Sequence, residues 1–127
     1  MPLKILIVDD QADSRKTLIK LLEEMSISYI EAFNGEDGLN KLKNNKDIVM
    51  VITDLEMPVM NGEELLKRIK SDDKLNHIPV TFYSSKWDNK IGSRLKGLGA
   101  SMFLPKPMKG VSMLKNIIEV VTKKKLD

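Results

Sequence analysis

The sequence contains no cysteine, and among its 127 residues it has a single histidine and a single tryptophan. Without cysteine, the chain can form neither a disulfide framework nor a thiolate metal site. The first residues, Met1 to Lys4, lead into a strand-like run without the long apolar segment of a signal peptide. We therefore expect a cytoplasmic protein with no membrane insertion.

The charge is also only weakly of one sign. The formal net charge of +3 comes from lysines spread along the chain, apart from a short cluster over residues 123–125. Such a diffuse excess is a weak indication of a nucleic-acid partner, and we do not expect one. A length of 127 residues corresponds to one domain, with no room for a second functional module, so residues 1–127 are expected to form a single domain.

Short apolar runs alternate with helical patterns along the whole chain. Between the first two runs, for example, Leu18, Leu22 and Met25 lie on one helical face, with Asp13 or Ser14 as the expected cap. Asn61 is expected to cap a later helix, with Glu64 completing a capping box. This alternation predicts an α/β fold of five βα units around a parallel sheet. The strands are expected at residues 3–8, 28–32, 48–53, 79–83 and 101–104.

Polar side chains follow four of these strands. Asp9 and Asp10 come after the first strand, Asp54 after the third, Ser84 after the fourth and Lys106 after the fifth. Because open parallel sheets bind ligands outside the carboxyl ends of their strands, we expect these side chains to converge at one edge of the sheet.

The three aspartates would lie within a few ångströms of one another if the first and third strands are neighbours. Two carboxylates about 4 Å apart repel by roughly 4 kcal/mol at an effective dielectric constant of about 20, so a purely structural role explains the cluster poorly. A bound Mg²⁺ would relieve the repulsion. An aspartate in this place could also attack phosphorus, with Lys106 neutralising charge and the Ser84 hydroxyl donating to a phosphoryl oxygen.

At these residues the sequence resembles the receiver domain of two-component response regulators. The resemblance rests on Ile7-Val8-Asp9-Asp10, on the run from Asp54 through Met57-Pro58 to Asn61-Gly62, on Ile78-Pro79-Val80 leading to Ser84, and on Gly99-Ala100 leading to Lys106-Pro107. It implies a flavodoxin-like, doubly wound (βα)5 fold with strand order 2-1-3-4-5. It also implies a single-domain, chemotaxis-type regulator without an output domain.

The resemblance also implies a role for each site residue. Asp54 would be the phosphoacceptor, while Asp9, Asp10, Asp54 and the backbone carbonyl of Glu56 would hold Mg²⁺, for which Mn²⁺ could substitute. Lys106 would bind the phosphoryl group, and a cis Lys106-Pro107 bond is expected. Ser84 and Phe103 would be the switch residues, and Glu56 and Lys86 would modulate the lifetime of the phosphorylated form.

Some positions depart from the commonest family pattern. Ser84 replaces a threonine, which keeps the hydroxyl and loses a methyl group, and Phe103 replaces a frequent tyrosine, which removes a phenolic hydrogen bond. Lys109 and Gly110 precede the last helix, where a capping side chain is expected. None of these changes removes a group that phosphoryl transfer requires.

The function that follows is a switch which receives a phosphoryl group from a histidine kinase or a histidine phosphotransfer protein. Its signal would reach a downstream protein target through the surface of the fourth helix, fifth strand and fifth helix, which includes Trp87, Lys90, Arg94, Phe103 and Lys115. Trp87 could equally cover the edge of the sheet, and His77 is expected to be an exposed loop residue. Two alternatives stay open: a phosphorylation-independent protein-binding module, and an aspartate-nucleophile phosphohydrolase.

Overall fold

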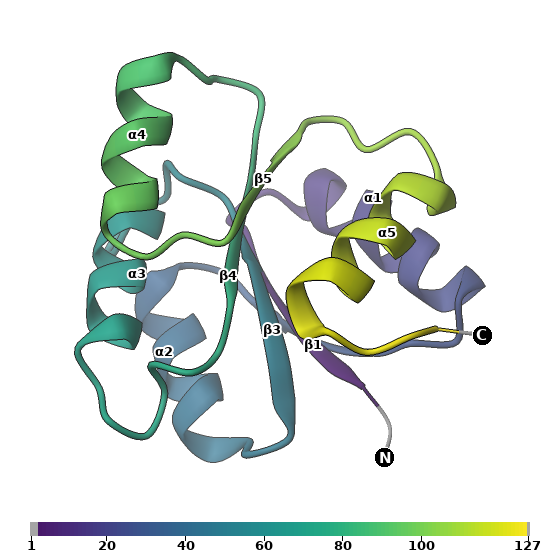
Figure 1. Ribbon diagram of the computed structural model, residues 1–127, viewed down its shortest axis with the longest axis horizontal. Coiled ribbons are helices and arrows are strands. Elements are labelled where there is room, and N and C mark those ends of the chain that lie inside the picture. Colours follow the sequence, from purple (N-terminus) through teal and green to yellow (C-terminus); the bar gives the residue numbers. More distant parts are fainter. Residues whose placement is uncertain (1–2, 127) are drawn as a thin grey trace.

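A computed structural model describes residues 3–126, in which strands and helices alternate from one end to the other (Figure 1). The strands are β1 (Lys4–Val8), β2 (Ser28–Ala32), β3 (Ile48–Thr53), β4 (Val80–Ser84) and β5 (Met102–Pro105). The helices are α1 (Ala12–Glu24), α2 (Gly35–Asn44), α3 (Gly62–Lys70), α4 (Asn89–Gly97) and α5 (Val111–Thr122).

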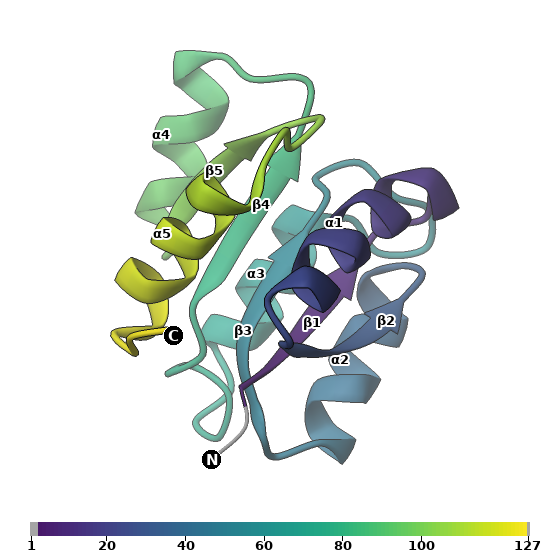
Figure 2. The ribbon, with the colours of Figure 1, turned by 90° about the vertical axis from the view of Figure 1, so that its right-hand side faces the viewer.

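The five strands form one parallel sheet in the order β2-β1-β3-β4-β5, which confirms the doubly wound (βα)5 fold expected from the sequence. Helices α1 and α5 cover one face of the sheet, and α2, α3 and α4 cover the other (Figures 1 and 2). Each face has its own hydrophobic core. Within β1, Leu6 and Val8 point into one core and Ile5 and Ile7 into the other, which is why the strand is apolar throughout.

The start of the first helix differs from the expectation. The cap residue is Gln11 rather than Asp13 or Ser14, and its side chain accepts no capping hydrogen bond. Instead, the Asp9 carboxylate accepts a hydrogen bond of 2.9 Å from the backbone N–H of Gln11. A side chain that accepts from the backbone two residues further on turns the chain locally. The helix begins at Ala12, and Asp13 lies in its first turn.

The other helix starts follow the sequence more closely. The side chain of Asn61 accepts a hydrogen bond from the backbone N–H of Glu64, so Asn61 caps α3 as predicted. The carboxylate of Glu64 pairs with Arg68 and not with the backbone N–H of Asn61, so the expected capping box is only half formed. Gly110 caps α5 without a side-chain hydrogen bond, which agrees with the absence of a capping side chain at this position.

Within residues 3–126, none of the helices combines the length and the apolar character needed to cross a lipid bilayer.

Candidate functional site

The pairing of β1 with β3 creates the site. Val8 lies opposite Thr53 in the parallel register, and the backbone N–H of Asp54 donates to the Val8 carbonyl at 2.9 Å. The residues that follow these two strands, Asp9 and Asp54, are therefore neighbours at the carboxyl edge of the sheet. The close approach expected from the strand ends is present.

Asp9, Asp10 and Asp54 each place a carboxylate oxygen within 4.8 Å of those of the other two. Asp9 is 2% exposed and Asp10 is exposed to solvent, so the cluster is buried at its base and open at its mouth. Hard carboxylate oxygens in this number are the donors that Mg²⁺ accepts, together with water and phosphate oxygens. The residues present therefore fit a divalent cation.

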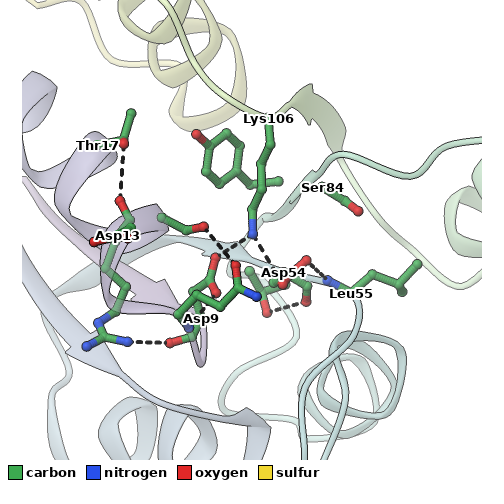
Figure 3. Close-up of polar contacts among 12 residues, drawn as sticks. Asp9, Asp13, Thr17, Asp54, Leu55, Ser84 and Lys106 are labelled. Carbon is green, nitrogen blue, oxygen red and sulfur yellow. Dashed lines mark hydrogen bonds and ion pairs between the residues drawn. The ribbon is translucent and has the colours of Figure 1, made fainter.

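Lys106 enters the cluster from the segment after β5. Its ammonium lies 2.8 Å from Asp9 Oδ2 and 3.2 Å from Asp54 Oδ2, between the two carboxylates (Figure 3). The other oxygen of Asp54 accepts a hydrogen bond of 2.8 Å from the backbone N–H of Leu55. The Lys106-Pro107 peptide bond is cis, as the sequence resemblance implies.

The electrostatic environment shifts the pKa values of Asp54 and Lys106. Burial raises the pKa of Asp54; the Lys106 ammonium opposes this effect and the Asp9 charge adds to it, leaving the pKa above the ordinary aspartate value. For Lys106, burial alone would lower the pKa, but the hydrogen bond that its ammonium donates to Asp9 and the charges of both carboxylates raise it above the ordinary lysine value. Lys106 is therefore held as a fixed cation beside Asp54.

Ser84 ends β4 and is buried, with 6% of its surface exposed. Its hydroxyl oxygen accepts a hydrogen bond of 3.2 Å from the backbone N–H of Lys86, and in Figure 3 it points away from the Lys106 ammonium. The Lys86 side chain lies 4.0 Å from the carboxylate of Glu56, and both side chains are at least three quarters exposed. The loops after β3 and β4 therefore bring these two exposed charges near one another.

The rings of Phe82, Trp87 and Phe103 form an aromatic cluster. The ring of Trp87 meets the ring of Phe103 edge to face at 5.0 Å between centroids, and it meets Phe82 in the same manner at 6.4 Å. Phe82 is completely buried, and the other two are partly buried against the same core. Trp87 thus covers the edge of the sheet, and it connects the β4–α4 loop to Phe103.

The remaining residues of the expected partner surface lie outside the carboxylate site. Lys90 is exposed, while Arg94 extends toward α3 and forms an ion pair with Glu63 at 2.8 Å. Lys115 lies partly exposed on α5. His77 is an exposed loop residue after α3, as expected.

Two contributors are absent from the sequence-based prediction. Arg15 donates at 2.8 Å to the backbone carbonyl of Asp9, pairs with Glu31 and lies over the ring of Phe33. Tyr83 accepts a hydrogen bond of 2.9 Å from the backbone N–H of Met108, which ties β4 to the segment after Lys106. These hydrogen bonds join residues 6 to 25 positions apart in the chain, so the local sequence pattern does not predict them.

The comparisons with known proteins agree with this geometry. Residues 5–118 match the family model of the response regulator receiver domain, and the chain therefore belongs to that family. It is 31% identical over 121 residues to the chemotaxis protein CheY1 of Helicobacter pylori, covering 94% of this chain and 96% of that protein. It is 38% identical over 112 residues to the chemotaxis protein CheV3 of the same species. That match covers 81% of this chain but only 36% of CheV3, so the chain spans about a third of its length.

Solved structures show the same fold. The chemotaxis protein CheY4 of Vibrio cholerae superimposes with a TM-score of 0.86 at 25% identity, over 94% of this chain and 99% of that protein. The CheY of a CheX–CheY–BeF3–Mg²⁺ complex from Borrelia burgdorferi superimposes with a TM-score of 0.85 at 29% identity, over 94% of this chain and 90% of that one.

Proposed function

We propose that this receiver domain accepts a phosphoryl group on Asp54 and acts as a signalling switch. The observation that carries the proposal is the position of the Lys106 ammonium between Asp9 and Asp54 at hydrogen-bond distance from both. A phosphoryl group on Asp54 would bring new negative charge to the place where this cation already lies. Fixed charges of this kind supply most of the catalysis in phosphoryl transfer, because little covalent chemistry is required of the protein.

The transfer itself needs one nucleophilic oxygen. A carboxylate oxygen of Asp54 would attack phosphorus in line with the phosphohistidine nitrogen of the donor. The new O–P bond forms as the P–N bond breaks, and the histidine nitrogen keeps the electron pair. Lys106 would neutralise charge on the phosphoryl oxygens. The Ser84 hydroxyl would reorient from the Lys86 N–H to donate to one of them.

A divalent cation completes the site in this proposal. Asp9, Asp10, Asp54 and the backbone carbonyl of Glu56 would hold Mg²⁺, for which Mn²⁺ could substitute. When bound, the ion would screen the charge of the incoming phosphoryl oxygens from the carboxylates. The Borrelia complex that contains both BeF3 and Mg²⁺ supports this assignment, since its CheY shares the fold.

We further propose that residues 1–127 act as one receiver domain between two kinds of partner. A histidine kinase or a histidine phosphotransfer protein would be the donor. The downstream target would be a protein that reads the face around Trp87, Lys90, Arg94, Phe103 and Lys115. Because the histidine of such donors is phosphorylated from ATP, we place the phosphoryl transfer to Asp54 in the cytoplasm. The domain would take part in its own phosphorylation and dephosphorylation, with Glu56 and Lys86 setting the lifetime.

Incubation with acetyl phosphate and Mg²⁺ separates this function from the two alternatives. A covalent phosphoryl adduct that decays slowly, detected as a mass increase of the intact protein, supports the switch. Rapid multiple turnover of varied phosphate esters would instead identify a phosphohydrolase, and the absence of any reaction would identify a phosphorylation-independent binding module. The Asp54→Asn variant is the matched control.

A further inference from the structure

A cavity of about 640 Å³ lies at the edge of the sheet opposite the carboxylate site. Its lining residues belong to the end of α2 and to residues 71–79, which connect α3 to β4. These two segments lie near the amino end of β3 (Figure 1). The phosphorylation proposed above makes no use of this cavity. Its volume is within the usual range of binding sites in proteins.

The floor of the cavity is apolar and held in place. Leu42, Leu75 and Ile78 line it, and all three belong to the hydrophobic core, with at most 7% of their surface exposed. The ammonium of Lys70 donates to the backbone carbonyls of Asn76 at 3.1 Å and Ile78 at 3.0 Å. These bonds fix the connecting segment against α3, so the cavity is formed before any ligand arrives.

The rim of the cavity is basic. Lys43, Lys46 and Lys74 line it, and within residues 3–126 none of the three takes part in an ion pair. One acidic residue, Asp72, also lines the cavity, and its carboxylate accepts a hydrogen bond of 2.8 Å from the backbone N–H of Lys74. His77 completes the rim and is exposed. Three lysines against one aspartate leave an excess of positive charge around an apolar floor.

We propose that this cavity binds an acidic segment of a partner protein that inserts one apolar side chain. The apolar side chain would contact Leu42, Leu75 and Ile78, while carboxylates on either side would meet the lysines of the rim. Lysine is a flexible point charge that can follow separate carboxylates along a peptide. Complementary charges of this kind increase the association rate and select against basic partners.

A compact anion such as free phosphate fits the cavity less well. Anion sites commonly use the N-terminus of a helix, where backbone N–H groups point at the ligand. Here α2 and α3 both present their carboxyl ends, where the helix dipole is negative. The positive charge therefore comes only from side chains at the rim, spread around an apolar floor, which suits an extended acidic peptide.

The position of the cavity has a consequence for signalling. It lies at the amino edge of the sheet, whereas Asp54 and Lys106 lie at the carboxyl edge. A partner bound here would leave the carboxylate site open to a phosphodonor. The segment should therefore bind with the same affinity whether or not Asp54 is modified, and would act as a constitutive tether.

The test uses two synthetic probe peptides and the ¹⁵N-labelled protein. One peptide has a central leucine flanked on each side by four alternating aspartates and glutamates, and the matched peptide has serine in place of the leucine. The leucine peptide should shift the backbone amide resonances of residues 42–46 and 72–78. The serine peptide should bind more weakly at the same residues. Addition of BeF3 and Mg²⁺ should leave both affinities unchanged.

Two variants of equal charge change control the experiment. The combined Lys43→Ala, Lys46→Ala and Lys74→Ala variant should weaken leucine-peptide binding about tenfold, as expected for three exposed charge pairs. A second variant replaces Lys16, Lys20 and Lys96, three exposed lysines elsewhere, with alanine and should bind like the parent protein.

Three results would overturn the proposal. The first is a set of resonance shifts that map elsewhere or do not occur, and the second is an equal loss of affinity in the two lysine variants. The third is saturable binding of inorganic phosphate or citrate at the same amides with higher affinity than the leucine peptide, which would make the cavity a small-anion site. None of these results depends on phosphorylation of Asp54, so the test is independent of the proposed switch.

Discussion

The ammonium of Lys106 lies 2.8 Å from the carboxylate of Asp9, a residue 97 positions earlier in the chain. Asp9 is only 2% exposed. The same ammonium reaches Asp54 at 3.2 Å. One cation therefore compensates two buried or half-buried carboxylates. The stability of the metal-free domain should depend on it.

Replacing Lys106 with methionine keeps much of the side-chain volume and removes the charge. Loss of one partner from a buried ion pair leaves an uncompensated charge, so we expect Lys106→Met to lower the free energy of unfolding by about 3 kcal/mol in EDTA. Added Mg²⁺ should recover part of that loss. Urea unfolding with and without Mg²⁺ measures both effects. Lys109→Met, at an exposed position in the same segment, is the control, and equal losses in the two variants would contradict the ion-pair interpretation.

The raised pKa of Asp54 predicts a pH-dependent effect of Asp54→Asn. A carboxyl group whose pKa is higher in the folded chain favours folding while it is protonated, and this contribution is lost as the pH rises through the folded-state pKa. In EDTA at pH 7 the charged Asp54 should therefore destabilise the domain, and Asp54→Asn should raise the melting temperature. The gain should shrink as the pH falls toward the ordinary aspartate value of 3.8.

Thermal unfolding between pH 4 and pH 7 tests this expectation. Asp73→Asn, in the exposed segment after α3, serves as the control and should change little across the range. A melting temperature that falls in Asp54→Asn at pH 7 would contradict the assigned electrostatics.

The acid cluster predicts that a divalent cation stabilises the domain. Since Mg²⁺ would bind the assembled cluster and not the unfolded chain, a concentration about ten times its dissociation constant should raise the melting temperature by roughly 4 °C. Asp10→Asn should reduce this response. Asp13→Asn, exposed nearby on α1, should leave it intact. Identical melting curves across a Mg²⁺ titration of the parent protein would show that the cluster binds no Mg²⁺.

Glu56 and Lys86 predict a small coupling in the lifetime of the phosphorylated form. Their charged atoms are 4.0 Å apart and largely exposed, so the pair should contribute about 0.5 kcal/mol, or about a twofold change in rate. A double-mutant cycle with alanine at both positions measures the coupling in the decay of the phosphorylated protein. The coupling should weaken at high salt, and the same cycle with Glu56 and Lys90 should give none. Strict additivity at low salt would show that the two residues act separately.

The fold and the central site were predictable because their signals are local. Each buried strand is a short apolar run, and the strand spans 28–32 and 48–53 agree with the structure residue for residue. The site follows from strand ends, since residues after neighbouring parallel strands must share one edge. Asp9, Asp54 and Lys106 could therefore be placed together without any knowledge of the loops.

The missing parts depend on contacts that the local pattern does not encode. Helix α1 begins earlier than predicted, at Ala12, because the Asp9 carboxylate accepts a hydrogen bond from the backbone N–H of Gln11. Asp13 then lies inside the helix and cannot cap it. The role of Arg15 depends on Glu31, and the basic cavity joins Lys46 to Lys74 across the length of a βα unit. Packing against partners distant in sequence decides each of these features.

The proposed switch is tested most directly by the chemical identity of the phosphorylated residue. The protein would be treated with acetyl phosphate and Mg²⁺ and then reduced with borohydride, which converts an aspartyl phosphate to homoserine, and its peptides would be analysed by mass spectrometry. We expect homoserine at position 54 alone, with no such product when Mg²⁺ is withheld. Homoserine at Asp9 or Asp10, or an unmodified Asp54 in a protein that carries phosphate elsewhere, would contradict it.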